Sequence, residues 1–174
     1  LYAGSIKKIY GIERLVKAFI QADIPDSELH IYGSGDYQDQ LLDVSKKYPN
    51  IKYFGNKVNE YVVQEEIKAS LLINPRPTNE EYTKYSFPSK NIEYMSTGTA
   101  LLTTNLPGMP KEYHEYVYLI EDESIAGLTN TLRDILSMPV EELHLKGQNA
   151  KRFIIENKNN VVQAKKILEM LKDL

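Results

Sequence analysis

Residues 87–98 read Phe-Pro-Ser-Lys-Asn-Ile-Glu-Tyr-Met-Ser-Thr-Gly and lead directly into the run Thr-Ala-Leu-Leu-Thr at residues 99–103. Pro88 is preset for the opening turn of a helix, Ser86 is placed to cap it, and Gly98 marks its end. The β-favouring residues after the glycine predict a returning strand. The stretch therefore predicts a loop, a helix and a strand, which is the repeating unit of an α/β fold.

The first turn of this predicted helix offers several groups that suit a phosphate. Backbone N–H groups at a helix start lack partners, and the helix dipole adds partial positive charge, so such a turn favours anions. Lys90 adds a full positive charge, and Glu93 lies one turn further along. A nucleoside diphosphate carries both phosphates and hydroxyls and fits this arrangement. A solvated Lys90–Glu93 ion pair with no role is the alternative, since the two residues share a helix face.

The rest of the chain alternates apolar strands with amphipathic helices. The clearest helix has apolar residues at helical spacing from Ile12 to Ile20. Strands are predicted near residues 1–4, 28–32, 51–54, 70–75, 99–103 and 117–120, and helices near 12–21, 36–47, 60–68, 87–98 and from 124 to the end. We therefore predict an α/β fold: a Rossmann-like, doubly wound parallel sheet with helices on both faces. Residues 1–174 would form one domain, with closing helices over about 141–174.

Composition narrows the class of protein. The 174 residues suffice for one ordinary domain with its own core. No apolar run approaches the length of a membrane span, and a formal net charge of -3 argues against a general nucleic-acid surface. The absence of cysteine excludes disulfides and thiol nucleophiles and agrees with a reducing cytoplasm. The chain opens abruptly on what reads as the tail of a strand, so we expect a fragment.

Glycines and polar loops follow the predicted strands directly. They are Gly4, Gly33, Gly55, residues 74–77 and residues 105–108. Ligands of open parallel sheets bind beyond the carboxyl ends of the strands, where loops lead into helices. We therefore expect a single ligand crevice along this rim of the sheet.

Basic residues near this rim are candidates for binding phosphate. Lys7 and Lys8 follow the first strand and could meet a diphosphate as point charges, or they could be solvated turn lysines. Arg76 follows a predicted central strand, where its guanidinium could pair bidentately with phosphate. Its alternative is an ion pair with Glu80 or Glu81 that orders the loop.

Two other features carry weaker signals. The turn Gly33-Ser34-Gly35 lets a ligand approach the backbone, but it lacks the third glycine of a dinucleotide fingerprint, so a bare tight turn is the alternative. His30, His114 and His144 lie on different predicted elements without the spacing of a metal pair. We interpret these histidines as structural and expect no metal site.

Seven segments form an ordered set over residues 1 to about 135: Tyr2-Ala3-Gly4-Ser5, Gly11-Ile12 with its helix to Phe19, Leu29-His30-Ile31-Tyr32-Gly33-Ser34-Gly35, Asn50-Ile51-Lys52-Tyr53-Phe54-Gly55, Asn74-Pro75-Arg76, Pro88-Ser89-Lys90 and Glu93-Tyr94-Met95-Ser96-Thr97-Gly98. In this order they resemble the C-terminal, donor-binding domain of family-4 retaining glycosyltransferases. The segment Phe87 to Lys90 is similar to that of bacterial enzymes that build cell-surface polysaccharides.

The resemblance implies a GT-B fold, in which two Rossmann-like domains face each other across a cleft. This chain would supply only the second domain, and the N-terminal acceptor domain would be absent. The implied activity is retaining transfer from a nucleoside-diphosphate sugar to a glycan or lipid-linked acceptor, with no cofactor or metal. A cytoplasmic location is expected, with contact at the inner membrane face left open through the acceptor domain. Without that domain, the fragment is expected to be inactive.

The resemblance also implies residue roles. Glu93 would bind the ribose hydroxyls, and Val58 with the backbone near Lys57 would hold the base. The residues expected to stabilise the departing diphosphate are Lys7, Arg76 and Lys90. The other residues expected to contact the nucleotide sugar are Gly4, Ser5, Lys8, Gly33, Gly35, Tyr85, Ser86, Pro88, Ser89 and Asn91.

Three positions depart from the family pattern. Ser5 and Tyr10 stand where the family commonly has arginine and lysine, and Tyr85 stands where the first of two glutamates usually approaches the sugar. These losses keep a non-catalytic nucleotide-sugar binding module as an alternative. A sugar-nucleotide epimerase-type GT-B half is a second alternative, although the histidine positions do not support it.

Overall fold

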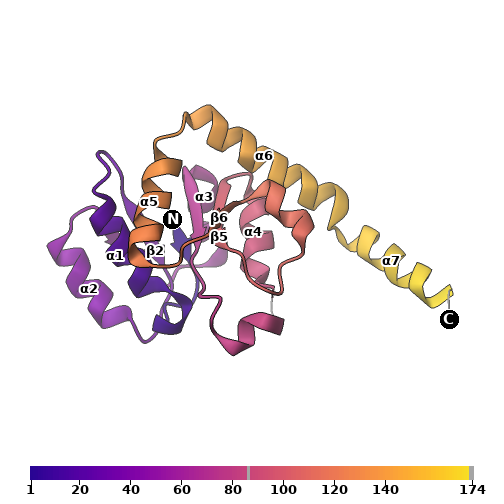
Figure 1. Cartoon of the computed structure of the whole chain (residues 1–174), viewed down its shortest axis with the longest axis horizontal. Helices are drawn as coiled ribbons and strands as arrows, with labels where there is room; N and C mark the ends of the chain where they lie inside the picture. Colours follow the sequence, from indigo (N-terminus) through magenta and orange to yellow (C-terminus); the bar gives the residue numbers. More distant parts are fainter. Residues whose placement is uncertain (86, 173–174) are drawn as a thin grey trace.

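The computed structural model describes residues 1–85 and 87–172 (Figure 1). Its strands are β1 (Tyr2–Ala3), β2 (Leu29–Tyr32), β3 (Ile51–Tyr53), β4 (Leu71–Asn74), β5 (Ala100–Thr104) and β6 (Tyr118–Ile120). Its α-helices are α1 (Ile12–Ala22), α2 (Gln38–Lys47), α3 (Asn59–Lys68), α4 (Ser89–Thr97), α5 (Ile125–Leu136), α6 (Val140–Asn157) and α7 (Asn160–Lys172). Short 3₁₀ helices are η1 (Lys8–Tyr10), η2 (Glu81–Tyr85) and η3 (Lys111–Tyr116).

The strands form two parallel three-stranded sheets that meet edge to edge. One has the order β1-β2-β3 and the other β4-β5-β6. The N–H of Ile73 on β4 donates to the carbonyl of Leu1, 3.0 Å away, and so joins the two sheets beside β1. The combined order, β3-β2-β1-β4-β5-β6, is that of a doubly wound Rossmann-like sheet. The predicted fold class is confirmed.

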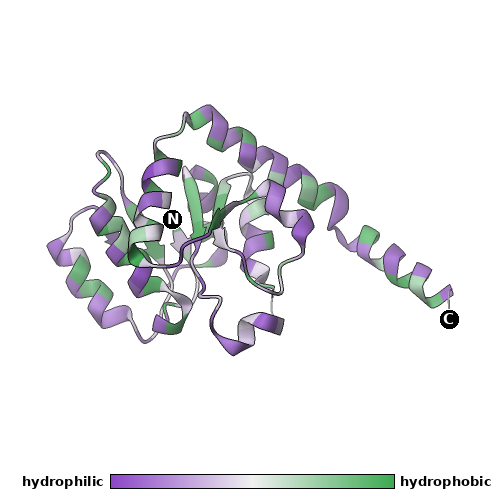
Figure 2. Ribbon diagram, in the orientation of Figure 1, coloured by the Kyte–Doolittle hydropathy of each residue, from purple (hydrophilic) through white to green (hydrophobic). Residues whose placement is uncertain are grey.

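Two apolar layers cover the two faces of the sheet, and alternating strand residues supply both. On β4, Leu71 and Ile73 face one layer, which also receives the buried side chains of α1, α2 and α5. Leu72 faces the other layer, beneath α3, α4 and α6. Figure 2 shows the hydrophobic strands at the centre of the molecule, with mixed helices around them. Helices on both faces follow from strands that are apolar on both sides.

Helix α4 differs from the prediction at its start but not at its end. Pro88 occupies the N-cap position, one residue before the helix, rather than the opening turn. Ser86, which we predicted as the cap, lies outside the described residues. Gly98 closes the helix with a left-handed φ of 86°, a conformation in which a side chain would be strained.

Buried hydrogen bonds fix α4 to the strands beneath it. The side-chain oxygen Oδ1 of Asn91 accepts a 2.6 Å hydrogen bond from the side-chain amide of Asn74 at the end of β4. The Asn91 amide group donates to the Thr103 hydroxyl on β5, 3.2 Å away. One turn later, the Tyr94 hydroxyl donates to the Ala3 carbonyl at 2.9 Å and accepts from its N–H at 2.7 Å. The first two turns of α4 are therefore held against the carboxyl ends of three strands.

The predicted closing helices are present, although they differ in packing. Helix α6 crosses α4 and β5, and its Gly147 lies so close to Gly98 that an added Cβ would come within 2.2 Å of the Gly98 carbonyl oxygen. Helix α7 has no buried residue and extends away from the rest of the molecule (Figure 1). Among the described residues, no helix is long and apolar enough to cross a membrane.

Replacing Asn91 with alanine should lower the free energy of unfolding by about 2 kcal/mol, because it leaves the buried Asn74 amide without its acceptor. Urea unfolding followed by circular dichroism measures this loss. The matched control is Asn130→Ala on the exposed face of α5, which should change stability by less than about 0.5 kcal/mol. An Asn91→Ala loss no larger than that of the control would contradict the anchoring role.

Candidate functional site

The candidate site lies where the strand order reverses, between β1 and β4. The loop after β1 leads to α1 in one apolar layer, and the loop after β4 leads to α4 in the other. Loops that diverge in this way leave a crevice at the carboxyl ends of the two strands. The predicted candidates Ser5, Lys7, Arg76 and Ser89 belong to loops and a helix start that border this point.

The glycine turns after β1 and β2 pack directly against each other. The Gly4 N–H donates to the Tyr32 carbonyl at 3.0 Å, and the Gly33 N–H donates to the Gly55 carbonyl at 2.9 Å. Gly33 has a φ of 128°, and a Cβ there would lie 1.8 Å from the Gly4 carbonyl oxygen. A Cβ on Gly35 would likewise meet the Ile6 carbonyl oxygen at 2.1 Å. Backbone packing thus requires both glycines, and their contact with a ligand stays a prediction.

The lysines after β1 are free to reach a ligand. Lys7 and Lys8 are both exposed, and neither forms an ion pair within the described part of the chain. The Lys8 backbone N–H donates to the Asp36 side chain at 2.8 Å, which fixes the loop but leaves the lysine side chain unused. The Tyr2 hydroxyl donates to the Ser5 carbonyl at 2.8 Å and holds the start of the same loop.

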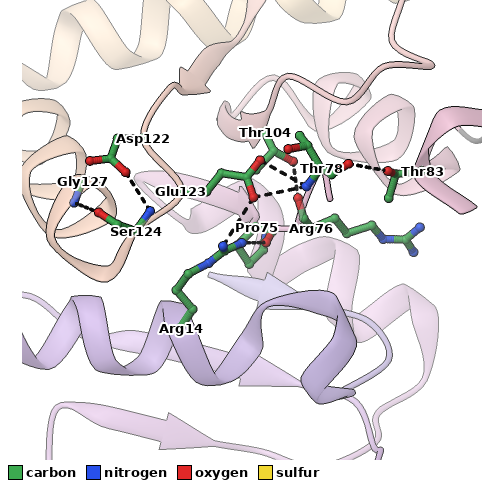
Figure 3. A network of polar contacts seen from close by, with 10 residues as sticks. All are labelled: Arg14, Pro75, Arg76, Thr78, Thr83, Thr104, Asp122, Glu123, Ser124 and Gly127. Carbon is green, nitrogen blue, oxygen red and sulfur yellow. Dashed lines mark hydrogen bonds and ion pairs between the residues drawn. The ribbon is translucent and has the colours of Figure 1, made fainter. Parts of the chain in front are cut away.

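The loop after β4 is held by a polar network around its backbone (Figure 3). The Thr104 hydroxyl donates to the Arg76 carbonyl at 2.5 Å, and the Thr78 N–H donates to both carboxylate oxygens of Glu123 at 3.1 Å. Glu123 also pairs with Arg14, 3.3 Å away. The Arg76 side chain points away from this network in Figure 3. The backbone of the loop is thus fixed while its guanidinium group is left for other contacts.

The Arg76 guanidinium lies over an aromatic ring instead of pairing with a carboxylate. Its Cζ is 4.5 Å from the centroid of the Tyr10 ring, and the Tyr82 ring meets Tyr10 edge-on at 6.1 Å. Across residues 1–85 and 87–172, no ion pair involves Arg76, so the alternative pairing with Glu80 or Glu81 is not seen. A cation–π contact holds the charge without neutralising it.

Three charged side chains form a cluster where the first two turns of α4 meet α3. The Lys90 ammonium is 2.8 Å from a carboxylate oxygen of Glu93 and 3.8 Å from one of Glu66 on α3. Glu66 is fully buried, while the Lys90 and Glu93 side chains are 25% and 35% exposed. Burial raises the pKa of Glu66 to about 7, although nearby Lys90 opposes the shift. The predicted Lys90–Glu93 pair therefore exists, but it belongs to a partly buried cluster.

The remaining predicted residues fall into two groups. Val58 is the N-cap residue of α3 and is 73% exposed; Lys57 and Ser89 are exposed as well. Tyr85 is 86% exposed. Asn91 and Pro88 are buried, and the Asn91 side chain is committed to the bonds described above. Ser86 lies outside the described residues. Roles in binding for all of these stay predictions.

A cavity of about 410 Å³ lies at the amino ends of the strands, opposite the candidate site. Leu1, Leu29 and Leu71, at the amino ends of their strands, contribute to its lining. Its lysine Lys68 is paired with Glu65 at 2.7 Å, and its Glu28 pairs with Lys52 at 3.6 Å. The cavity lacks the free positive charge that a diphosphate needs, so we place the candidate site at the carboxyl ends of the strands.

Three residues of this region were missed by sequence reasoning. The sequence marks Tyr10 only as a departure from the family pattern, and it assigns no role to Glu66 or Glu123. Each acts through a partner distant in sequence: Arg76, Lys90 and the Thr78 backbone. One signal was available, because Glu66 follows Val62 at the helical spacing of the buried face of α3.

Comparisons with known proteins agree with this geometry. The model of the family "Glycosyl transferases group 1" matches residues 1–153. Among solved structures, HepE of Anabaena in complex with UDP aligns with a TM-score of 0.77 at 16% identity, over 99% of this chain and 49% of HepE. HepE has also been solved with UDP-glucose, and that structure aligns with a TM-score of 0.72. The chain thus spans about half the length of HepE.

Two further structures show the same arrangement. The C-terminal domain of LpcC, a glycosyl transferase group 1 family protein from Francisella tularensis, aligns with a TM-score of 0.70 at 18% identity, over 91% of this chain and 86% of that domain. WaaG, a glycosyltransferase involved in lipopolysaccharide biosynthesis, aligns with a TM-score of 0.68 at 21% identity, over 89% of this chain and 42% of WaaG.

No curated protein sequence matches the chain significantly. At the identities of the solved structures, their likeness shows the fold alone. The family model carries the assignment, because it spans 153 of the 174 residues. The chain belongs to the glycosyl transferases group 1 family.

Proposed function

We propose that residues 1–174 form the donor-binding domain of a retaining GT-B glycosyltransferase whose acceptor-binding domain lies outside this sequence. The donor would be a nucleoside-diphosphate sugar, and the acceptor a glycan or lipid-linked sugar in cell-surface polysaccharide synthesis. Transfer would take place in the cytoplasm, with any membrane contact made through the acceptor domain. The fact that the chain spans 49% of HepE supports a larger whole protein.

The observation that carries this proposal is the unpaired Arg76 at the point where the strand order reverses. Its guanidinium rests on Tyr10 rather than on a carboxylate, and exposed Lys7 lies nearby, with its ammonium 6.0 Å from the same ring. The first turn of α4 follows the loop after β4 and so borders the same strand ends, and N–H groups at a helix start favour an anion. Two cations and a helix start supply what a diphosphate needs.

The chemical task would be to break the bond between the sugar and the diphosphate. Positive charge develops on the sugar and negative charge on the departing nucleoside diphosphate, so fixed donors at the diphosphate lower the barrier. Lys7, Arg76 and Lys90 would stabilise that charge, and Glu93 would hold the ribose hydroxyls. The acceptor would attack from the face that the diphosphate leaves, which retains the configuration at the sugar.

We expect the chain to bind UDP, GDP or their sugars, because the crevice offers charge to the shared diphosphate. Isothermal titration calorimetry with UDP, UDP-glucose and GDP measures the affinity. Glu93→Gln should weaken binding of the nucleoside diphosphate and of the nucleoside alike, since the ribose is common to both. Heat from none of these ligands at millimolar concentration would reject both the transferase and the non-catalytic binding module.

Arg76→Ala should weaken UDP binding about tenfold, because a charge-assisted hydrogen bond to phosphate is lost. Binding of uridine, which has no phosphate, should not change. Calorimetry with UDP and with uridine distinguishes a contact with the phosphate from a general effect on the site. Arg152→Ala on the exposed surface of α6 serves as the control. An equal loss for uridine and UDP would mean that Arg76 supports the loop rather than the diphosphate.

Lys90→Ala in the full-length enzyme should lower kcat about 100-fold with a smaller change in KM, because the lost charge acts mainly on the departing diphosphate. Steady-state transfer assays give both constants. Near-normal turnover would remove Lys90 from the catalytic set. The 174-residue chain alone should show no transfer. Full-length protein that binds donor but never transfers would favour the binding module.

A further inference from the structure

Glu66 is a buried acid that the proposed mechanism does not use. It lies on the inner face of α3, is fully buried, and neither of its carboxylate oxygens has a hydrogen-bond partner within the described residues. Its backbone carbonyl is occupied, since it accepts from the Thr99 hydroxyl at 2.8 Å. A buried charge without a hydrogen bond is costly, so the nearest opposite charge decides its state.

The charged and titratable side chains nearest to Glu66 come from α4. Lys90 is the nearest charge, 3.8 Å away, and Glu93 shares the same ammonium at 2.8 Å. The Tyr94 hydroxyl is committed to Ala3, and burial raises its pKa well above the usual value. One ammonium group thus serves two carboxylates.

We propose that Glu66 is a positioning residue for Lys90: its carboxylate holds the ammonium group beside Glu93 in the free protein, and it takes up a proton when an anionic donor engages Lys90. The inference rests on the proposed function, because it requires a diphosphate at Lys90. Donor binding would thus be coupled to the uptake of a proton by Glu66.

The reason for proton uptake is electrostatic. A diphosphate at Lys90 neutralises the charge that compensates Glu66, whether the ammonium moves or stays. Glu93 is 35% exposed and can be solvated by water, whereas Glu66 is fully buried and cannot. The pKa of Glu66, already raised to about 7 by burial, must therefore rise further on binding.

Glu66 should also make the stability of the free protein depend on pH. Because the pKa of Glu66 rises from an ordinary 4.5 to about 7 on folding, the folded state holds the proton more tightly. The stability from this group is present below about pH 4.5 and is lost as the pH rises through about 7. The urea midpoint of the wild type should therefore fall relative to Glu66→Gln between pH 5 and 8. Parallel midpoints would show that folding leaves the pKa of Glu66 unchanged, which removes the electrostatic basis of the proposal and overturns it.

Calorimetry with UDP-glucose tests proton uptake directly, because this ligand has no group that titrates near neutral pH. Binding heats at pH 7.5 in two buffers of different ionisation enthalpy should show uptake of about 0.5 proton per ligand. Glu66→Gln should abolish the buffer dependence while binding persists. Glu65→Gln, its neighbour paired with Lys68, should keep it. Lys90→Met is the second variant, and it should also abolish the dependence.

The outcomes separate the two proposals. Uptake that depends on both Glu66 and Lys90 supports the inference. UDP-glucose binding without proton uptake in the wild type overturns the inference and leaves the proposed function intact. Uptake that persists in Glu66→Gln assigns the proton to another group and also overturns it. If UDP-glucose, UDP and GDP all fail to bind, the proposed function falls and takes the inference with it.

Discussion

The hydrogen bonds of Asn91 set the geometry on which the candidate site depends. Its buried amide joins Asn74 at the end of β4 to Thr103 on β5 and so fixes the first turn of α4 above the strand ends. A buried amide that loses a partner costs about 1–3 kcal/mol, so the helix has little freedom to rotate or slide. Lys90 is the residue before Asn91, so its backbone position is fixed as well.

The fold was predictable because its signals are local. Apolar runs such as 70–75 and the stop at Gly98 predict strands and helix ends without reference to distant residues, and the structure confirms them. The start of α4 differs by one residue from the prediction, because Pro88 suits both the first turn and the N-cap position that it occupies. Helix boundaries depend on one or two residues, whereas the order of elements depends on many.

The candidate site was only partly predictable, because its charges are balanced by tertiary contacts. The spacing of Lys90 and Glu93 predicts their pairing, and the structure shows it. Nothing in the sequence shows that α3 would bring buried Glu66 within 3.8 Å of the same ammonium. The ring of Tyr10 beneath Arg76 is equally invisible, since 66 positions separate the two residues and only the meeting of β1 with β4 brings them together.

Arg76 and Lys90 are held by different interactions, and this difference suits them to different tasks. The cation–π contact of Arg76 with Tyr10, both partly buried, is worth between about 0.5 and 2 kcal/mol, against roughly 1.5–3 kcal/mol for a charge-assisted hydrogen bond. A phosphate can therefore compete for Arg76 without displacing a carboxylate. Lys90 is already paired with Glu93 and must exchange one anion for another. Arg76 can thus donate to a diphosphate without losing another ion pair. When a diphosphate binds Lys90, by contrast, the carboxylates that lose its charge must be compensated in another way.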